Sequence, residues 1–586
     1  MERKGRGREL KVLQALSRNE PARLAVLAAV CGLLFWVFLG AAPFHDKGEP
    51  REALVVRDIV VNGNWLFPLR LGEVIPSKPP LFHWVAAAGS LARGEMTEAS
   101  VRFPSAFFGT LAVLLIYFLG SRIYDPQTGL LGAVALATTA VFQGAAVEAR
   151  VDMALAFFVT CSLVLFFSIY RGVLRHGAWT YLFFLVSGAG VLAKGPVSLI
   201  LCGIVVVAFL AARRRWDFML ALLRHPGVPL GAALFLLWYG SALWHGGSEF
   251  FGLQFVKENL ARFFIHGEGG TGHQKPVYYF IPYLFTLGMP WTLFLPAVAW
   301  VVFASRLHRD ERGLFLLIWA FTVLVFFSLS AGKRPPYILP LYPAWCLLMA
   351  AAAREQERVH TGAAGVYLKG VGCLLGAVGV LVLAAGFARG LGWSAAELLG
   401  LAGIRLEGEA GHAAAAVEAA LKSAAWTAAI LVYGSGLLWL GASRPLLLGS
   451  WRRAMTGIAL VSIVNGCLVQ ALVSPALARS RSYKDFVSAA LARSAGRPVL
   501  LYAEGVDGSS VFFYGGAGVE AVAGNYQTLL GRLRTEPRCV VMGESVWRSL
   551  DDGAARWSVV LRSHGTGPDG NQPLVLVRGA AGGCSD

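Results

Sequence analysis

Charged side chains are scarce for a protein of this length. Only 15% of the 586 residues are Asp, Glu, Lys or Arg, and 56% are hydrophobic, whereas soluble domains have about 25% charged residues. A soluble globular protein is therefore excluded for most of the chain, which is expected to lie in lipid. Acids are scarcer still, 35 against 52 basic residues, giving a net charge of +17. The basic residues sit in short blocks between apolar runs, so they indicate membrane topology and not nucleic acid binding.

Other common features are also missing. The eight cysteines show no CxxC or Cys/His spacing, so no structural zinc site is expected. Most lie in apolar segments as small hydrophobic residues. Cys539 and Cys584 lie nearer the C-terminus, where a disulfide is an open alternative in an oxidising compartment. A transporter is expected to have an internal repeat and charged residues within its apolar runs. This sequence shows no internal repeat and few such charges.

Apolar windows of membrane-spanning length make up most of residues 24–475. They predict a polytopic α-helical membrane protein with about 13 helices. Arginines recur in alternate connections, which places these on the cytoplasmic side. We predict a basic cytoplasmic N-terminus (1–23), a transmembrane domain (24–475) that begins with a retained signal anchor, and outer loops at 44–103 and 246–278. The windows are 24–43, 104–121, 128–146, 153–170, 179–193, 197–212, 228–245, 279–304, 314–331, 336–353, 366–388, 424–442 and 455–474.

From residue 476 the composition changes. The runs VLLYAE, VFFYGG, CVVMGE, WSVVLRS and LVLVRG are typical of short strands, and 525–534 and 544–552 are typical of helices. We predict a small α/β periplasmic domain over 476–586. It contains no phosphate loop and no nucleophile elbow.

The first outer loop contains acids, arginines and a Lys-Pro-Pro step. Asp46, Glu49 and Arg51 precede the run EALVVRDIV, whose apolar spacing predicts an amphipathic helix that begins at residues 49–51. A helix N-terminus beside an arginine suits an anionic ligand. Lys78 follows in a Lys-Pro-Pro step on extended backbone, just before the chain becomes apolar again. This loop is our first candidate site.

Other polar residues interrupt the apolar runs on the same side. Asp152 opens an apolar run, where it could cap a helix or act in a site. Lys194 is a lone cation whose alternatives are a snorkelling turn lysine or a site residue. Cations on outer loops break the positive-inside rule, and binding of a phosphate or pyrophosphate accounts for them. The remaining candidates are Glu258, Arg262, His273, Tyr279, Lys333, Arg334 and Tyr337.

An ordered set of motifs resembles one family. EPREALVVRDIVVNGNW, SKPPLFHW, ARVDMALAFF, AKGP, KENLARFF, HQKPVYYFIPYL and KRPPYILPLYP are similar to motifs of the bacterial aminoarabinose-transferase-like membrane glycosyltransferases. These enzymes are GT-C fold relatives of the protein O-mannosyltransferases. The resemblance implies transfer of a sugar from a polyprenyl phosphate, typically undecaprenyl phosphate, to lipid A or another envelope acceptor. It also implies a location on the periplasmic face of the bacterial inner membrane.

The resemblance also assigns residues. The family's acidic-acidic-x-Arg motif falls on residues 48–51, where Gly48 replaces the key acid. Glu49 or Asp46 is then expected to take over as the catalytic carboxylate, with Asp152 as the second. The predicted phosphate ligands are Arg51, Lys78, Arg262, Lys333 and Arg334, and the other substrate-site candidates are Lys194, Glu258, His273, Tyr279 and Tyr337.

The expected chemistry is an inverting in-line displacement. Lys and Arg would stabilise the leaving phosphate while a carboxylate orients or deprotonates the acceptor hydroxyl. No cofactor is certain, and a divalent cation near Asp46, Glu49 and Asp152 is an open alternative that the spacing does not require. Alternative functions are a protein O-glycosyltransferase of the same fold, a lipid flippase or transporter, and a non-catalytic scaffold that the Gly48 replacement leaves open.

Overall fold

The computed structural model describes most of the 586 residues. It leaves out residues 1–18, 266–273, 357–361, 395–396, 399, 401–407, 495, 523, 525, 536–537, 551–557, 565–566, 569–571, 579–583 and 585–586.

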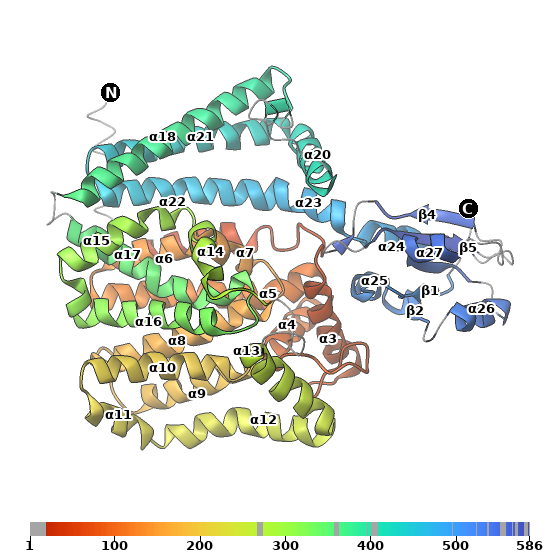
Figure 1. The fold of residues 1–586 in the computed structure, drawn as a ribbon, viewed down its shortest axis with the longest axis horizontal. Coiled ribbons are helices and arrows are strands. Elements are labelled where there is room, and N and C mark those ends of the chain that lie inside the picture. The colour runs from red at the N-terminus through yellow and green to blue at the C-terminus, as the bar shows by residue number, and fades with distance from the viewer. Residues whose placement is uncertain are drawn as a thin grey trace.

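The bundle is helical, as the apolar windows predict (Figure 1). By length and composition, eight helices of the described part could cross a membrane, or up to ten if each of two bent pairs is one span. The predicted number of 13 is not confirmed, because several windows form shorter or broken helices. The 128–146 window bends by 66° between α6 and α7, and the 279–304 window bends by 104° before Trp291. The helices α9 and α10 have only 17 and 16 residues.

The first half of the bundle carries the loops that build the site. Its elements are α2 (Glu20–Cys31), η1 (Gly32–Trp36), α3 (Gly48–Asn62), α4 (Leu81–Arg93), α5 (Glu98–Ile123), α6 (Pro126–Ala137), α7 (Ala140–Ala146), α8 (Val151–Tyr170), α9 (Ala178–Lys194), α10 (Val197–Ala212), α11 (Trp216–Leu223), α12 (Gly227–Phe250) and η2 (Phe251–Ala261).

The second half completes the bundle. It contains α13 (Arg262–Phe264), η3 (Val277–Tyr279), α14 (Phe280–Leu287), η4 (Trp291–Phe294), α15 (Leu295–Ala304), η5 (Leu307–Arg309), α16 (Glu311–Leu329), η6 (Pro335–Leu341), α17 (Tyr342–Gln356), α18 (Ala363–Gly390), α20 (Gly408–Ser423), α21 (Ala425–Leu447), α22 (Trp451–Leu468), η7 (Val469–Val473) and α23 (Ser474–Arg481).

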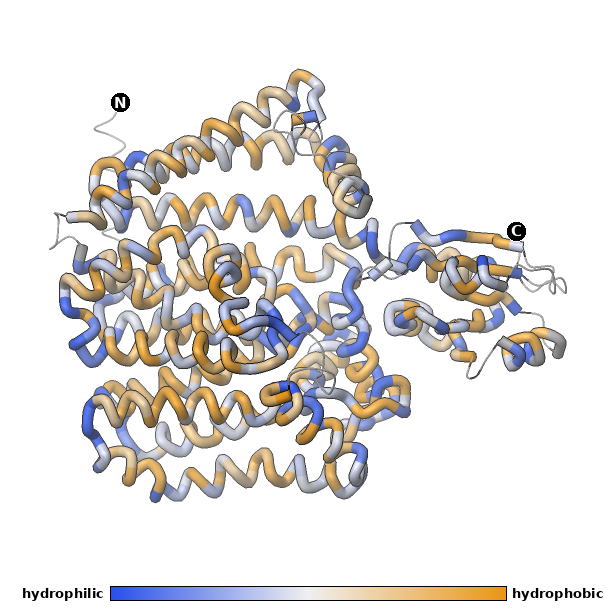
Figure 2. The backbone as a smooth tube through the Cα atoms, in the orientation of Figure 1, coloured by the Kyte–Doolittle hydropathy of each residue, from blue (hydrophilic) through white to orange (hydrophobic). Residues whose placement is uncertain are grey.

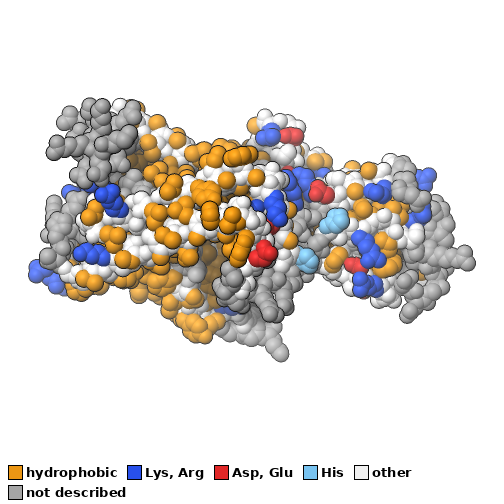
Figure 3. All heavy atoms as spheres, turned by 90° about the horizontal axis from the view of Figure 1, so that it is seen from above, with side chains coloured by type: hydrophobic (Ala, Val, Ile, Leu, Met, Phe, Trp, Pro, Cys, Tyr) orange, Lys and Arg blue, Asp and Glu red, His pale blue; other side chains and the backbone are white. Residues whose placement is uncertain are grey.

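Charged residues gather at both ends of the bundle. Connections predicted to be cytoplasmic meet at one end, where Glu311 accepts from Arg171 at 2.7 Å and from Arg213 at 3.1 Å. Figure 2 shows hydrophilic residues at the ends of a largely hydrophobic bundle, and Figure 3 shows Lys and Arg gathered at the left end and at the junction with the C-terminal domain. Connections predicted to be outside meet at that junction. The orientation in the membrane stays a prediction.

A five-stranded sheet forms the C-terminal domain, in the order β2-β1-β3-β5-β4. Strand β1 is parallel to β2 and β3, whereas β5 is antiparallel to β3 and β4. The prediction for VFFYGG is wrong, because this run is helix α25, and a short apolar run does not distinguish helix from strand. The elements are α24 (Lys484–Arg493), β1 (Val499–Tyr502), α25 (Ser509–Gly515), η8 (Gly516–Gly518), β2 (Val519–Ala521), α26 (Tyr526–Thr535), β3 (Val540–Gly543), α27 (Glu544–Leu550), β4 (Ser558–Arg562) and β5 (Leu574–Arg578).

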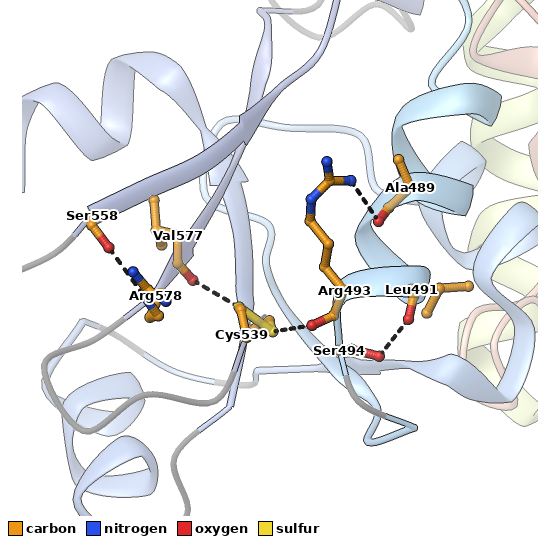
Figure 4. The surroundings of a disulfide bond; sticks show 9 residues. Ala489, Leu491, Arg493, Ser494, Cys539, Ser558, Val577 and Arg578 are labelled. Carbon is orange, nitrogen blue, oxygen red and sulfur yellow. Dashed lines mark hydrogen bonds between the residues drawn. A yellow bond between two sulfur atoms is a disulfide. The ribbon is translucent and has the colours of Figure 1, made fainter. Parts of the chain in front are cut away.

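One disulfide bond and one packing contact stabilise this domain and its position. Cys539 and Cys584 are joined by a disulfide, the alternative left open by the sequence, with Cys539 beside the carbonyl of Arg493 in α24 (Figure 4). The helix α25 lies against α3 (Figure 1), and Phe513 packs on Phe44 with ring centroids 4.8 Å apart. The domain therefore rests directly on the first outer loop.

Candidate active site

Six of the predicted residues meet in one network at the outer end of the bundle. The Lys78 ammonium lies 2.5 Å from the Glu258 carboxylate, which also pairs with Arg262 at 3.2 Å. Arg262 donates to the Tyr337 hydroxyl at 3.1 Å. The remaining two members, Lys194 and Asp152, form an ion pair, and the Lys194 ammonium lies 4.4 Å from the centre of the Tyr337 ring.

Different elements deliver these side chains. Lys78 stands in the loop before α4, and Lys194 ends α9, where Gly195 turns the chain with φ +90°. Glu258 and Arg262 lie one turn apart on the helical segment formed by η2 and α13. Asp152 lies in the first turn of α8, where it pairs with Lys194 and does not cap the helix.

The network borders a cavity of about 460 Å³. Lys78, Lys194, Glu258, Arg262 and Tyr337 line it together with two other polar residues, Asn259 and Ser330. Burial lowers the pKa of Lys78, and the nearby Arg262 and Lys194 lower it further while Glu258 opposes them. Concentrated positive charge beside aromatic walls suits a phosphate that carries an apolar chain. The apolar wall consists of Val197, Ile200, Phe251, Phe255, Leu260, Phe263, Phe264, Phe326 and Phe327.

A second acidic cluster lies at the start of α3. Glu49 is 1% exposed, and its two carboxylate oxygens accept from Arg102 at 2.7 and 2.8 Å and from the Ala149 backbone at 2.9 Å. Asp46 accepts from the backbone N–H groups of Gly48 and Glu49 and pairs with Arg150. Glu49 and Asp46, two of the three predicted catalytic carboxylates, are thus held by cations and by backbone N–H groups in this structure.

The Gly48 replacement has a physical reason. A Cβ atom at Gly48 would meet the Arg150 guanidinium nitrogen Nη1 at 1.7 Å. The guanidinium therefore takes the space beside α3 that a side chain would occupy, and Asp46 neutralises it from the preceding loop. Burial alone would raise the pKa of Asp46, but Arg150 and the Glu49 backbone N–H hold that pKa below its usual value.

Other predicted phosphate ligands lie elsewhere. Arg51 donates to Asp507 of the C-terminal domain at 2.9 Å, so it joins the two domains and does not border the cavity. Lys333 is 2% exposed and its ammonium donates to the backbone carbonyls of Lys275, at 2.8 Å, and Ser330. The phosphate-binding assignments of Arg51 and Lys333 stay predictions, and in this structure both cations have protein partners. Both cations were grouped with the site because they lie on outer loops, which does not fix their partners.

The three remaining predicted site residues, Arg334, Tyr279 and His273, do not belong to the network around Lys78 and Glu258 in the described structure. Arg334 is half-buried and acts electrostatically on Asp152. The Tyr279 ring packs at a tilt of 42° against Tyr283, with ring centroids 4.7 Å apart, and does not line the cavity. His273 lies outside the described residues.

Sequence reasoning passed over several buried polar residues. A hydrogen bond of 2.6 Å joins the Glu52 carboxylate to Nε2 of the fully buried His83. The positive charges of Arg150 and Lys78 also stabilise the ionised Glu52 carboxylate. Arg102, the partner of Glu49, is not among the predicted site residues, because it lies inside a largely apolar helix. A charged residue within an apolar run was the available signal for Arg102.

A cation site is not assembled from the predicted acids. Asp46, Glu49 and Asp152 pair with Arg150, Arg102 and Lys194 respectively. Within the described residues, no group of three or more His, Cys, Asp or Glu side chains could hold a metal ion.

Comparison with known proteins agrees with this geometry. Residues 77–244 match the dolichyl-phosphate-mannose-protein mannosyltransferase family. The undecaprenyl phosphate-alpha-4-amino-4-deoxy-L-arabinose arabinosyl transferase of Pseudomonas aeruginosa is 31% identical over 375 residues, 63% of this chain and 66% of the relative. Its counterpart in Enterobacter sp. is 29% identical over 326 residues, 55% of this chain and 58% of the relative. The predicted resemblance is confirmed. The chain thus spans less than two thirds of either relative in these alignments.

The fold of one solved structure is similar to that of this chain over nearly its whole length. The crystal structure of ArnT from Cupriavidus metallidurans bound to undecaprenyl phosphate has a TM-score of 0.73 and 20% identity, covering 95% of this chain and 98% of that one. The similarity in fold includes the C-terminal region, which the sequence motifs did not reach. At 20% identity the comparison shows a similar fold alone.

Proposed function

We propose that this protein is an inverting membrane glycosyltransferase. It transfers a sugar from an undecaprenyl phosphate-linked donor to a hydroxyl or phosphate of lipid A or a similar envelope acceptor. The observation that carries the proposal is the cavity where Lys78, Lys194 and Arg262 converge beside a wall of phenylalanines. Proteins similar in sequence are named for undecaprenyl phosphate-dependent arabinosyl transfer.

In this proposal the cations hold the donor phosphate. Arg262 can bind two phosphate oxygens at once, and Lys78, which pairs with the same Glu258 oxygen, supplies a compact charge. Glu258 presently bridges the two cations and marks the position of an anion between them. When the bond between the anomeric carbon and the phosphate breaks, the same cations stabilise the developing negative charge. The phenylalanines contact the first isoprene units.

The remaining ion pairs keep this arrangement rigid. Asp152 holds Lys194, whose ammonium faces the Tyr337 ring. Glu49 and Arg102 anchor the start of α3 to α5 with a bidentate pair. Through these contacts the acids predicted as catalytic serve as positioning residues, and none of the three is proposed as the base.

The proposed location follows from the distribution of arginine. The donor cavity lies at the end of the bundle opposite the Arg171 and Arg213 connections. Because cytoplasmic connections carry the excess of arginine, we place the site and the C-terminal domain on the periplasmic face of the bacterial inner membrane.

A second candidate is protein O-glycosylation with the same donor class. The match of residues 77–244 to the protein mannosyltransferase family favours it. The donor chemistry is unchanged, and only the acceptor differs.

A transfer assay tests the proposed function. Purified protein in detergent is incubated with undecaprenyl phosphate-linked sugars, aminoarabinose first, and with lipid A or a Ser/Thr-rich peptide as acceptor. Mass spectrometry should detect glycosylated lipid A, and Lys78→Ala and Arg262→Ala should abolish it. Glycosylated peptide alone would select the second candidate. Absence of any transfer across the donor panel, by protein that binds undecaprenyl phosphate, would overturn the proposal.

A further inference from the structure

The first outer loop exposes apolar side chains between the end of α3 and the donor cavity. Each of these side chains is between 41% and 49% exposed: Trp65, Leu66, Leu71 and Val74. Apolar side chains that gather on a surface mark a site of contact with a membrane or another protein.

These residues belong to one compact segment, residues 64–74, which we call the apolar loop. The Asp58 carboxylate closes it, because it accepts from the Asn64 side chain at 3.0 Å and from the Leu69 backbone at 2.8 Å. Asp58 itself is only 3% exposed. The apolar side chains on either side of these contacts are therefore held on one structured loop.

The apolar loop rests against the outer half of α12. The Trp238 indole donates to the Leu66 carbonyl at 2.9 Å, and the Phe67 ring stacks on His245 with centroids 6.2 Å apart. The helix that contains these residues is long and apolar enough to cross a membrane, and Trp244 is 88% exposed. Exposed tryptophan is typical of the depth where a spanning helix meets the membrane–water interface. The apolar loop therefore lies close to that interface.

The tip of the apolar loop has an unfavourable residue for its backbone. Leu71 and Gly72 have positive φ angles of +56° and +76°. They lie in a turn closed by two backbone hydrogen bonds between Arg70 and Val74, of 2.8 and 3.0 Å. Such turns favour Asn-Gly, and a bulky side chain is strained at positive φ. An exposed leucine gains little from the protein in this strained position, so we expect it to contact something outside the protein.

The residue before Leu71 supplies a positive charge. Within the described part of the chain, the Arg70 guanidinium forms no hydrogen bond and no ion pair. Burial and the nearby Arg51 lower the pKa of Arg70, while Asp507 and Glu52 oppose them. A guanidinium that lacks a protein partner and stands beside an apolar tip suits the phosphate of a lipid head group.

We propose that the tip of the apolar loop inserts into the membrane leaflet on the side of the C-terminal domain, where Arg70 binds the phosphate of an anionic phospholipid. Leu71 enters the apolar layer, and the guanidinium stays among the head groups. The partner is a lipid because the loop continues the lipid-facing surface of α12. It is an anionic lipid because of the charge of Arg70; Glu73 of the same turn is exposed and does not pair with this arginine.

The same segment leads directly to the donor cavity. Val74 precedes Lys78 by four residues, and the Gln254 side chain donates to the intervening Pro76 carbonyl at 2.6 Å. The turn and Lys78 thus belong to one continuous held segment. Contact of the tip with the leaflet therefore sets the depth of Lys78 relative to a phosphate carried by a lipid of that leaflet.

Two variants separate the apolar contact from the charge. Leu71→Asn removes the apolar tip while suiting the positive φ, so the turn is kept. Arg70→Gln removes the cation alone. Arg93→Gln is the matched control, because Arg93 is an exposed arginine at the end of α4 in the same outer loop and pairs with Glu95.

The assay is photocross-linking of the full-length protein in nanodiscs of equal parts phosphatidylglycerol and phosphatidylcholine. One lipid at a time carries a diazirine in its acyl chain, and tandem mass spectrometry measures the yield on residues 70–74. The wild type should cross-link to both lipids and favour phosphatidylglycerol about fivefold. Arg70→Gln should keep the cross-links and lose the preference. Leu71→Asn should lose most cross-links to both lipids, with a Tm no lower than that of the wild type, and Arg93→Gln should behave as the wild type.

The outcomes that overturn the proposal are equally specific. A wild type without lipid cross-links on residues 70–74, or a Leu71→Asn variant that keeps them, overturns the membrane contact. A preference for phosphatidylglycerol that is missing in the wild type, that survives Arg70→Gln, or that Arg93→Gln also removes, overturns the role of Arg70. The readout is lipid contact, so each outcome is independent of whether the protein transfers a sugar.

Discussion

Replacing Lys78 by Met should weaken donor binding strongly, because Lys78 faces both a fixed acid and the proposed phosphate. Its side chain is 13% exposed and that of Glu258 only 8%. At about 4 Å and an effective dielectric constant of about 20, one cation contributes about 4 kcal/mol of attraction to a phosphate. Removing one partner of a buried ion pair costs about 3–5 kcal/mol.

The Coulomb estimate indicates a loss of about 3–4 kcal/mol in donor binding, or more than about 100-fold in Kd, whereas the ion-pair estimate applies to folding stability. Part of that loss comes from Glu258, whose charge is no longer neutralised by Lys78 and repels the phosphate. The double variant Lys78→Met/Glu258→Gln should therefore recover about tenfold of the lost affinity, equivalent to about 1.4 kcal/mol.

Binding of radiolabelled undecaprenyl phosphate to purified protein in nanodiscs measures these changes. Thermal unfolding of each variant controls for loss of structure. The reasoning is refuted if Lys78→Met binds with wild-type affinity, or if adding Glu258→Gln gives no recovery.

Three further variants probe the structural cluster, each by the apparent Tm of the protein in detergent. Arg102→Met should lower stability by about 3–5 kcal/mol, because it leaves the Glu49 charge buried without its partner; an unchanged Tm would contradict the anchoring assignment. Gly48→Ala should cost about 1–3 kcal/mol by overpacking against Arg150, and a stabilised variant would contradict the geometry. The lowered pKa of Asp46 stabilises the protein above about pH 4, and this contribution is lost as the pH falls through the folded pKa. Asp46→Asn should therefore flatten the dependence of Tm on pH below about 5, and an unaltered slope would exclude Asp46 as its source.

The sequence predicts the helical bundle well because hydropathy is a local property. Every predicted window falls on helix for most of its length, although α9 and α10 are short and two windows are bent. It also names several of the charged residues that line the cavity proposed for the donor. Lys78, Lys194 and Arg262 were singled out because cations on outer loops need a reason to be there, and the fold brings them together.

Partners across the fold could not be predicted in the same way. Glu49 has the composition of a catalytic acid until Arg102, 53 residues later, fills both of its oxygens. Arg51 meets Asp507, which is 456 residues away. A charged residue indicates that some partner is needed, but only the tertiary structure shows whether protein or ligand provides it.

A structure with undecaprenyl phosphate bound in nanodiscs tests the central claim most directly. We expect the phosphate within hydrogen-bonding distance of Lys78 and Arg262, with the first isoprene units against Phe255 and Phe326. A phosphate bound elsewhere on the protein, with the Lys78–Glu258–Arg262 network intact, would contradict it.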